Sequence, residues 1–309
     1  MTLSDLMLQV RAEAQAGRRL DRALAAAPVL PFDDRSRLIF FSDLHRGDNT
    51  PADAFRCNRD LFIGALRHYE REGYTYVEVG DGDELWKNKS LEAVHAAHRP
   101  VFRIMERLRR RGRLQLLIGN HQLLPRRGRN VWRGGPLLEA LVLQYRNRPL
   151  RILVTHGHQA DATHVRPYGL IRPVVRHLVR HLQRWGLSTW LPEKAAAHSV
   201  SPLAGAIALA HSNQAGIERR IQAWLERTAG LAIICGHTHR PAFAAAGGPL
   251  YFNTGSGIQP GTITGLEIAN GAISLVAWSD RRPEGPGAAS MPHLPRRTVL
   301  AGPEPLSSL

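Results

Sequence analysis

The sequence contains few cysteines, and this scarcity excludes two kinds of site. Cys57 and Cys235 are the only two, and neither belongs to a CxxC pair. A disulfide framework and a cysteine-bound zinc site are therefore not expected. Proteins without disulfides are typical of reducing compartments, so we expect a cytoplasmic protein.

Long hydrophobic runs are also lacking. No apolar stretch approaches the roughly 18 residues that a membrane-spanning helix requires. The opening residues, MTLSDLMLQVRAEAQAGRR, interrupt their apolar positions with acidic and polar side chains, which is typical of a short amphipathic helix and not of a signal peptide. We therefore expect a protein without a transmembrane segment or a visible secretion signal.

Acidic residues are outnumbered by basic ones. The chain has 41 Lys and Arg against 26 Asp and Glu, which gives a formal net charge of +15 at pH 7. This balance favours an anionic partner, and phosphate compounds, nucleic acids and acidic membranes all qualify. Hydrophobic residues make up 43% of the chain and charged residues 22%, so a soluble globular protein is expected and a disordered or fibrous one is not.

Short apolar runs recur along the chain, and each ends in Gly, Asp, Asn or His. Runs of this kind, bounded by polar residues, predict buried strands. They lie at residues 38–43, 76–81, 114–120, 152–156 and 231–237. Helical patterns between the first runs, at 55–72 and 91–111, complete the alternation that is typical of βαβ units. Later strands are predicted to join at a hairpin turn, Asn270-Gly271.

These elements predict a mixed α/β fold with one main domain, from residue 35 to 280. An N-terminal helical extension, 1–34, precedes it. A stretch without strand pattern, from about 162 to 229, interrupts the sheet strands and predicts a helical insertion. From 281 to 309 Pro and Gly are dense and periodicity stops, so we expect a flexible tail.

Polar side chains with metal-binding chemistry follow the predicted strands. Carboxylate, imidazole and amide groups suit divalent first-row metals, and the strand ends of an α/β sheet converge on one crevice. A lone histidine among the 15 in the chain is more often a surface or core residue than a ligand. The ordered set nevertheless predicts one site. Its members are Asp43 and His45 in SDLHRGD, Asp81 in GDGDELW, Asn120 and His121 in GNHQLL, His156 in HGHQAD, and His237 and His239 in GHTHRP.

In this order the blocks DxH, GDxx[DE], GNH, His-Gly and GHxH resemble the calcineurin-like metallophosphoesterase family. The resemblance covers Leu38 to Ile268 apart from the insertion. It implies a four-layer α/β/β/α sandwich for the metallophosphoesterase domain, with two metal ions bridged by a carboxylate and a hydroxide. It further implies that one ion takes Asp43, His45 and His239, that the other takes Asn120, His156 and His237, and that Asp81 bridges them.

The bridging position has two possible registers, because GDGDELW contains both Gly80-Asp81 and Gly82-Asp83. The family pattern has an acid three residues after the bridging Asp. Asp81 finds this acid in Glu84, whereas Asp83 finds Trp86. We therefore expect Asp81 to be the bridging residue.

Two cations about 3.5 to 4 Å apart depress the pKa of a shared water and neutralise charge on phosphoryl oxygens. The implied enzyme is a metal-dependent hydrolase of phosphoric esters or anhydrides, in which the hydroxide attacks phosphorus in line. A histidine-rich, thiol-free ligand set favours manganese, with iron or zinc as alternatives, over magnesium.

His121 occupies the position where the family has a residue that contacts phosphate and protonates the leaving oxygen. The alternative is a structural histidine beside the metal site. The sequence departs from the common GNHD or GNHE form, because residue 122 is Gln. The resemblance implies that an acid at this position orients the histidine, so Gln122 predicts weaker proton donation and a preference for good leaving groups.

Several arginines are candidate substrate-binding residues. Arg46 and Arg240 adjoin ligand blocks, while Arg126 and Arg127 follow the GNH block, where a solvated loop is an equally good interpretation. The insertion carries a basic stripe opposite an apolar face. This stripe predicts either peripheral contact with an anionic membrane or a core-packed helix with a solvated face. Its members are Arg172, Arg176, Arg180 and Arg184.

Three functions remain open at this stage. The SDLH and GHTHRP blocks are similar to the UDP-2,3-diacylglucosamine diphosphatase branch of the family, but GNH departs from the GNR form common there. Phosphatase and phosphodiesterase activities therefore both remain. A basic nuclease is the second enzymatic hypothesis, motivated by the net charge. A non-catalytic metal-binding scaffold is the third, motivated by Gln122.

Overall fold

The computed structural model describes residues 3–88, 90–122, 131–132, 135–161, 214–280 and 295–309. The expected helix around Arg172–Arg184, and the loop that carries Arg126 and Arg127, lie outside these residues.

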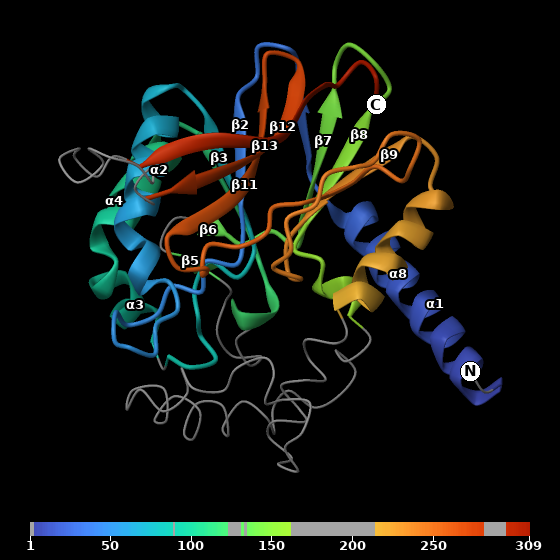
Figure 1. The fold of residues 1–309 in the computed structure, drawn as a ribbon, viewed down its shortest axis with the longest axis horizontal. Helices are drawn as coiled ribbons and strands as arrows, with labels where there is room; N and C mark the ends of the chain where they lie inside the picture. The colour runs from blue at the N-terminus through green and yellow to red at the C-terminus, as the bar shows by residue number, and fades with distance from the viewer. Residues whose placement is uncertain (1–2, 89, 123–130, 133–134, 162–213, 281–294) are drawn as a thin grey trace, which may run out of the picture.

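Two sheets lie face to face at the centre of the molecule (Figure 1). The first has the order β1-β7-β8-β9-β10 and is built from β1 (Val29–Phe32), β7 (Ala140–Tyr145), β8 (Arg151–Thr155), β9 (Leu231–Cys235) and β10 (Tyr251–Asn253). The second has the order β13-β12-β11-β2-β3-β4 and is built from β2 (Leu38–Phe41), β3 (Thr75–Val79), β4 (Leu114–Leu117), β11 (Thr262–Ala269), β12 (Ala272–Ser279) and β13 (Arg296–Pro305).

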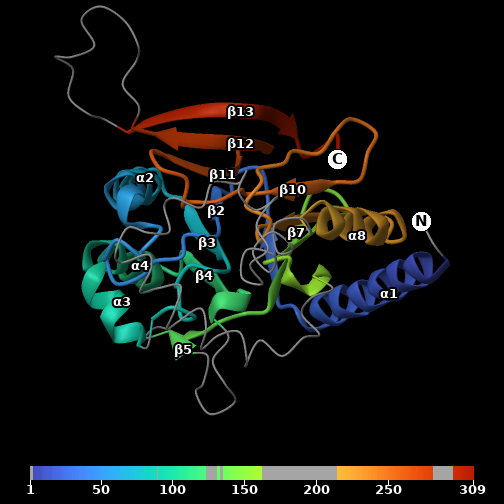
Figure 2. The ribbon, with the colours of Figure 1, turned by 60° about the horizontal axis from the view of Figure 1, so that its bottom comes forward.

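Helices cover the outer face of each sheet (Figures 1 and 2). The six-stranded sheet carries α2 (Arg59–Arg71), α3 (Leu91–Ala97) and α4 (Arg99–Arg110). The five-stranded sheet carries α1 (Leu3–Ala26) and α8 (Gln214–Glu226). Short elements connect these layers: η1 (Arg56–Asn58), η2 (Asn120–Gln122), η3 (His158–Ala160), and a small hairpin of β5 (Val131–Trp132) and β6 (Gly135–Pro136). The mixed α/β/β/α fold class predicted from the sequence is confirmed.

The buried strands explain this layering. In β2 the side chains alternate: Leu38 and Phe40 enter the core between the sheets, whereas Ile39 and Phe41 pack under α2 and α4. Because successive side chains of a strand point to opposite faces, a continuously apolar strand requires cover on both sides. Val154 of β8, in the other sheet, also faces the inter-sheet core.

The predicted strand runs are confirmed as β2, β3, β4, β8 and β9, and the helical segments as α2, α3 and α4. The hairpin turn between β11 and β12 is also confirmed. Asn270 and Gly271 have φ angles of 53° and 69°, as expected when both central turn residues adopt positive φ.

The flexible tail predicted for 281–309 is wrong for its last part. Residues 296–305 form β13, which pairs antiparallel with β12. Arg297 forms an ion pair with Glu267, and Leu306 is buried under the sheet edge. Long-range pairing of this kind overrides the local signals of Pro and Gly.

The N-terminal extension, 1–34, contains more than a helix. β1 adds a parallel edge strand beside β7, and α1 buries Ala16 and Leu20 against the sheet and α8. α8 occupies the end of the predicted helical insertion. Within the described part of the chain, no helix is both long and apolar enough to cross a membrane.

Candidate metal centre

The seven predicted ligand side chains converge at one end of the two sheets. Asp43 and His45 follow β2, Asp81 follows β3, Asn120 follows β4, His156 follows β8, and His237 and His239 follow β9. Two backbone hydrogen bonds hold the loops after β2 and β3 together, from Asp43 N to Gly80 O at 3.2 Å and from His45 N to Asp81 O at 2.9 Å. The parallel strands therefore deliver their polar ends to one place.

The backbone at the site adopts sparsely populated conformations. Five of the seven residues have positive φ: Asp43 at 51°, His45 at 48°, Asp81 at 50°, His237 at 69° and His239 at 56°. For residues other than glycine this region costs about 1 to 3 kcal/mol each, and such strain gathers at functional sites. The surrounding sheets therefore hold the backbone of these residues in a conformation that is unfavourable in isolation, and this conformation sets the directions of their side chains.

Two glycines of the motifs are required by close approach. A Cβ at Gly119 would collide with the Asp81 carboxylate, and one at Gly236 would collide with Ser42 and the Asp43 carboxylate. Glycine permits backbone to approach a neighbouring group where any side chain would clash. This explains why the Asn and the first His of the GN and GH blocks follow glycine.

One group of candidate ligands comprises Asp43, His45 and His239, whose ligand atoms all lie within 4.8 Å of one another. Nε2 of His239 lies 3.1 Å from Oδ1 of Asp43 and 3.4 Å from Nε2 of His45. Burial opposes ionisation of Asp43, but His239 and His156 hold the pKa of this carboxyl well below its usual range. Asp43 is therefore anionic in this cluster.

A second group comprises Asp81, His156 and His237. Nε2 of His156 lies 3.1 Å from Oδ2 of Asp81 and 3.2 Å from Oδ1 of Asn120. Nδ1 of His156 lies 2.9 Å from the carbonyl of Val79, so it donates there and leaves Nε2 to face the site. A ligating histidine is commonly oriented by such a second hydrogen bond.

Asp81 belongs to the second group and also forms a third group with His45 and His121. Its Oδ2 atom is 3.1 Å from Nε2 of His156 and 4.0 Å from Nε2 of His45. Asp83 points elsewhere, with Oδ1 2.8 Å from Nε of Arg46. Asp81 is therefore the acid of this pair that lies in the cluster, and its bridging role stays a prediction.

The donor set fits divalent transition metals. Oδ1 of Asp43 is buried and faces imidazole nitrogens of His239 at 3.1 Å and His45 at 3.8 Å, while Oδ2 accepts from the backbone N of His237 at 2.8 Å. The facing nitrogens of His45 and His239 also need a proton or a cation between them. Imidazole, carboxylate and amide oxygen are the ligands expected for manganese, iron or zinc.

Neighbouring carboxylates favour protonated imidazoles when no metal is bound. Burial lowers the pKa of His45, but Asp43, Glu84 and Asp81 outweigh burial and raise it to about 10. Burial also lowers the pKa of His156, but the nearby carboxylates of Asp81 and Asp43 outweigh burial and raise this pKa to about 9. A cation that enters the site replaces these protons.

Arg46 corrects one prediction. Its side chain is fully buried, with Nη1 and Nη2 at 2.6 and 2.8 Å from the Glu78 carboxylate and Nε at 2.8 Å from Asp83. The guanidinium also lies 5.1 Å from the ring centroid of Phe102. Arg46 therefore cannot contact a substrate, and it ties the loops after β2 and β3 together. Its position beside His45 was misleading, because the two neighbouring side chains point to opposite sides.

Arg240 has a mostly exposed side chain, with Nη1 3.9 Å from Glu218. Its substrate-binding role stays a prediction. The roles predicted for Arg126 and Arg127 lie outside the described residues.

His121 belongs to the group with His45 and Asp81 and is also held by Glu84. Nδ1 of His121 is 2.9 and 3.1 Å from the two Glu84 oxygens. Trp86 stacks on the imidazole with centroids 4.1 Å apart and planes at 15°. Burial opposes ionisation of Glu84, but His121 and His45 hold its pKa well below the usual range. Glu84 is thus an anionic partner for His121.

Among the described residues, the side chain of Gln122 is bound to the backbone and not to His121. Its Oε1 atom accepts from the backbone N of Gly119 at 3.1 Å, and the side chain is buried. The acid that orients His121 comes from the loop after β3. The GDxx[DE] spacing contained this signal, because it singles out Glu84. Two further residues of the site were not predicted from the sequence. Trp86 stacks on His121, and Asp161 places Oδ2 3.5 Å from Nε2 of His237.

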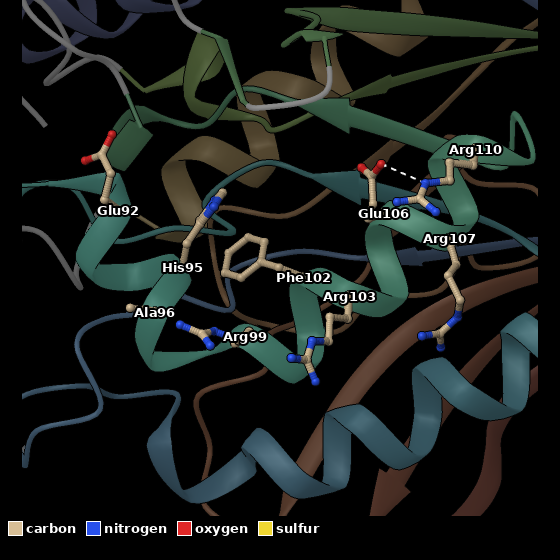
Figure 3. A pocket seen from close by; sticks show the side chains of 9 residues that line it. All are labelled: Glu92, His95, Ala96, Arg99, Phe102, Arg103, Glu106, Arg107 and Arg110. Carbon is tan, nitrogen blue, oxygen red and sulfur yellow. Dashed lines mark hydrogen bonds and ion pairs between the residues drawn. The ribbon is translucent and has the colours of Figure 1, made fainter.

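A separate cavity of about 710 Å³ lies along α3 and α4 (Figure 3). Its lining includes Arg99, Arg103 and Phe102, and on its rim Glu106 pairs with Arg110 at 3.1 Å. None of the predicted metal or catalytic residues lines this cavity. The predicted metal-binding and catalytic residues instead lie in the loops that follow β2, β3, β4, β8 and β9.

Comparisons with known proteins give structural likenesses only. No protein-family model matches the chain, and no curated protein matches it. Vacuolar protein sorting 29 from Cryptosporidium parvum is similar over 85% of this chain and 96% of its own, with 12% identity and a TM-score of 0.38. A point mutant of a cold-active protein tyrosine phosphatase is similar over 80% of both chains, with 12% identity and a TM-score of 0.37. What the chain does is therefore inferred from the site itself.

Proposed function

We propose that this chain is a dinuclear-metal-dependent hydrolase of phosphate esters or phosphoanhydrides. The observation that carries the proposal is the overlap of three groups of mostly buried carboxylates and imidazoles, two of which share Asp81. Purely structural histidines have no reason to gather with carboxylates at positive-φ positions of several different loops. A non-catalytic scaffold would not need to retain the complete set.

The proposed ligands form two sets joined by Asp81. Asp43, His45 and His239 hold one ion, and Asn120, His156 and His237 hold the other. When bound, the two ions supply positive charge that stabilises the phosphoryl oxygens and makes a water molecule more acidic. Manganese is the proposed metal, with iron or zinc as alternatives, because the set is rich in imidazole and lacks thiols.

His121 is the proposed general acid. Water oxygen bonds to phosphorus and gives up one proton to solvent, the bond between phosphorus and the leaving oxygen breaks, and His121 donates its proton to that oxygen. Solvent then returns a proton to His121. Glu84 at Nδ1 fixes the imidazole so that Nε2 is the donor, and Trp86 restricts rotation of the ring. Because Glu84 is anionic, proton donation does not depend on residue 122. Esters with poor leaving groups are therefore substrates as well as anhydrides.

The finer substrate class is also a proposal. Similarity of the SDLH and GHTHRP blocks to the UDP-2,3-diacylglucosamine diphosphatase branch favours a nucleoside diphosphate anhydride, peripheral membrane contact through the insertion, and a cytoplasmic location. Arg240, exposed beside His239, is the proposed substrate contact. The second candidate is a nuclease, which the net charge of +15 favours.

A substrate panel tests the proposal. Bis-p-nitrophenyl phosphate, p-nitrophenyl phosphate, UDP-sugars and a single-stranded oligonucleotide are offered with and without Mn²⁺. We expect metal-dependent turnover of at least one, lost in Asp81→Asn and retained in Asp60→Asn, which changes an exposed carboxylate on α2. Turnover that ignores both the metal and Asp81 would contradict the proposal.

A further inference from the structure

Two arginines hold the turn that follows His156. Arg19 of α1 donates from Nε to the carbonyl of Gln159 at 2.5 Å and from Nη2 to the carbonyl of Asp161 at 2.9 Å. Arg220 of α8 donates from Nε to the intervening carbonyl, that of Ala160, at 2.7 Å. Three consecutive carbonyls, at and just after η3, are thus bound by two helices that lie side by side on the same sheet (Figure 2).

The same turn is fixed from within. Gly157, directly after His156, has a φ of 105°. Its backbone N donates to Oε1 of Gln159 at 3.1 Å, and Nε2 of Gln159 donates to Glu139 at 3.3 Å. The side chain at the end of the turn, Asp161, therefore has a defined position and is 7% exposed.

Asp161 faces a proposed metal ligand. Its Oδ2 atom lies 3.5 Å from Nε2 of His237. His237 belongs to the group with Asp81 and His156, and its backbone N is bound to Asp43. A carboxylate at one imidazole nitrogen keeps the proton there and leaves the other nitrogen for the metal. Asp161 is the carboxylate in position to do this for His237.

We propose that Asp161 and Arg19 are positioning residues for the metal held by Asn120, His156 and His237. Asp161 fixes the tautomer and ring direction of His237. Arg19 fixes Asp161 by binding its carbonyl, so the N-terminal helix is part of the metal centre's support and not a dispensable extension. This inference rests on the proposed function, because it concerns one of the two proposed ions.

Metal titration of matched variants tests the proposal. Arg19→Gln removes the two carbonyl contacts. Arg22→Gln removes an exposed arginine of the same helix that, among the described residues, bonds to Arg18 O at 3.2 Å within α1. Binding of Mn²⁺ is measured by isothermal titration calorimetry, together with thermal unfolding of the metal-free proteins. We expect Arg19→Gln and Asp161→Asn each to weaken one of two sites about 10- to 100-fold. Arg22→Gln should bind as wild type does.

The combination of variants separates positioning from general stability. If Arg19 acts through Asp161, the double variant should bind the metal no more weakly than Asp161→Asn alone. Equal weakening of both sites in step with a lower melting temperature would overturn the proposal, as would unchanged affinity in Arg19→Gln. Should Arg19→Gln fail to fold, Asp161→Asn carries the same test. A wild-type protein that binds no Mn²⁺ would instead contradict the proposed function.

Discussion

Nδ1 of His121 lies 2.9 Å from a carboxylate oxygen of Glu84, and both side chains reach this contact from loops that follow adjacent strands. Glu84 in turn accepts from the backbone N of Trp86 at 2.9 Å. The acid that serves His121 is therefore built into the loop of Asp81. The carboxylate that contacts His121, the proposed proton donor, therefore comes from outside the local sequence around His121.

Removal of this carboxylate should weaken proton donation. Glu84→Gln keeps the size of the side chain but loses its charge, so we expect turnover of an alkyl phosphate ester to fall about 10²- to 10⁴-fold. Turnover of a p-nitrophenyl ester, whose leaving group needs less protonation, should fall much less. Gln122→Glu is the control and should leave the dependence of rate on leaving-group pKa unchanged. An equal loss for both esters in Glu84→Gln would refute the role.

Asp81 and Asp83 should have separable effects. Asp81→Asn should prevent binding of the paired metals, because this carboxylate serves both groups. Asp83→Asn should retain metal binding but lower the free energy of unfolding by about 1 to 3 kcal/mol, since it weakens the buried contact with Arg46. Metal analysis and denaturant unfolding measure the two effects. If Asp83→Asn lost metal binding and Asp81→Asn retained it, Asp83 and not Asp81 would be the bridging residue.

Metal affinity should rise with pH. In the metal-free protein the pKa of His45 is about 10 and that of His156 about 9, so both imidazoles carry protons at pH 7. Raised pKa values stabilise the metal-free fold below the unfolded value of about 6.5, and this stability is lost as pH rises through 9 to 10. Metal binding must therefore release protons at pH 7 to 8. Calorimetry in two buffers of different ionisation enthalpy measures this release, and identical heats in both would contradict it.

The last strand should contribute to stability. Leu306 is 1% exposed and Leu300, on the same segment, is 51% exposed. Leu306→Ala should lower the free energy of unfolding by about 2 to 5 kcal/mol, as expected for a buried leucine. Leu300→Ala, the matched control, should change it by less than about 0.5 kcal/mol. Similar values for both variants would mean that residues 296–309 do not pack as the structure has them.

The sequence predicted the central strands because their apolar runs are continuous, and it singled out the ligands because each follows such a run. It did not predict β13, because the pairing of Val299 with Val276 depends on residues far apart in the chain. Nor did it predict the direction of Arg46. Adjacent side chains diverge at the positive-φ position of His45, and only the fold determines which one faces the site.

The contact between α1 and the turn that follows His156 also escaped prediction. Arg19 lies in a helix whose apolar positions indicated only an amphipathic segment, and its contacts are backbone carbonyls, which no side-chain pattern marks. Gln122 misled for the opposite reason, since its proximity to His121 in the chain suggested a contact that Glu84 makes instead.

The most direct test of the account is the metal content of the protein after incubation with Mn²⁺ and removal of the excess. We predict two equivalents per chain in the wild type and at most one in Asp81→Asn, with hydrolysis of bis-p-nitrophenyl phosphate present only when two are bound. A folded wild-type protein that retains no metal, or that hydrolyses the ester equally well after chelation, would contradict the dinuclear centre.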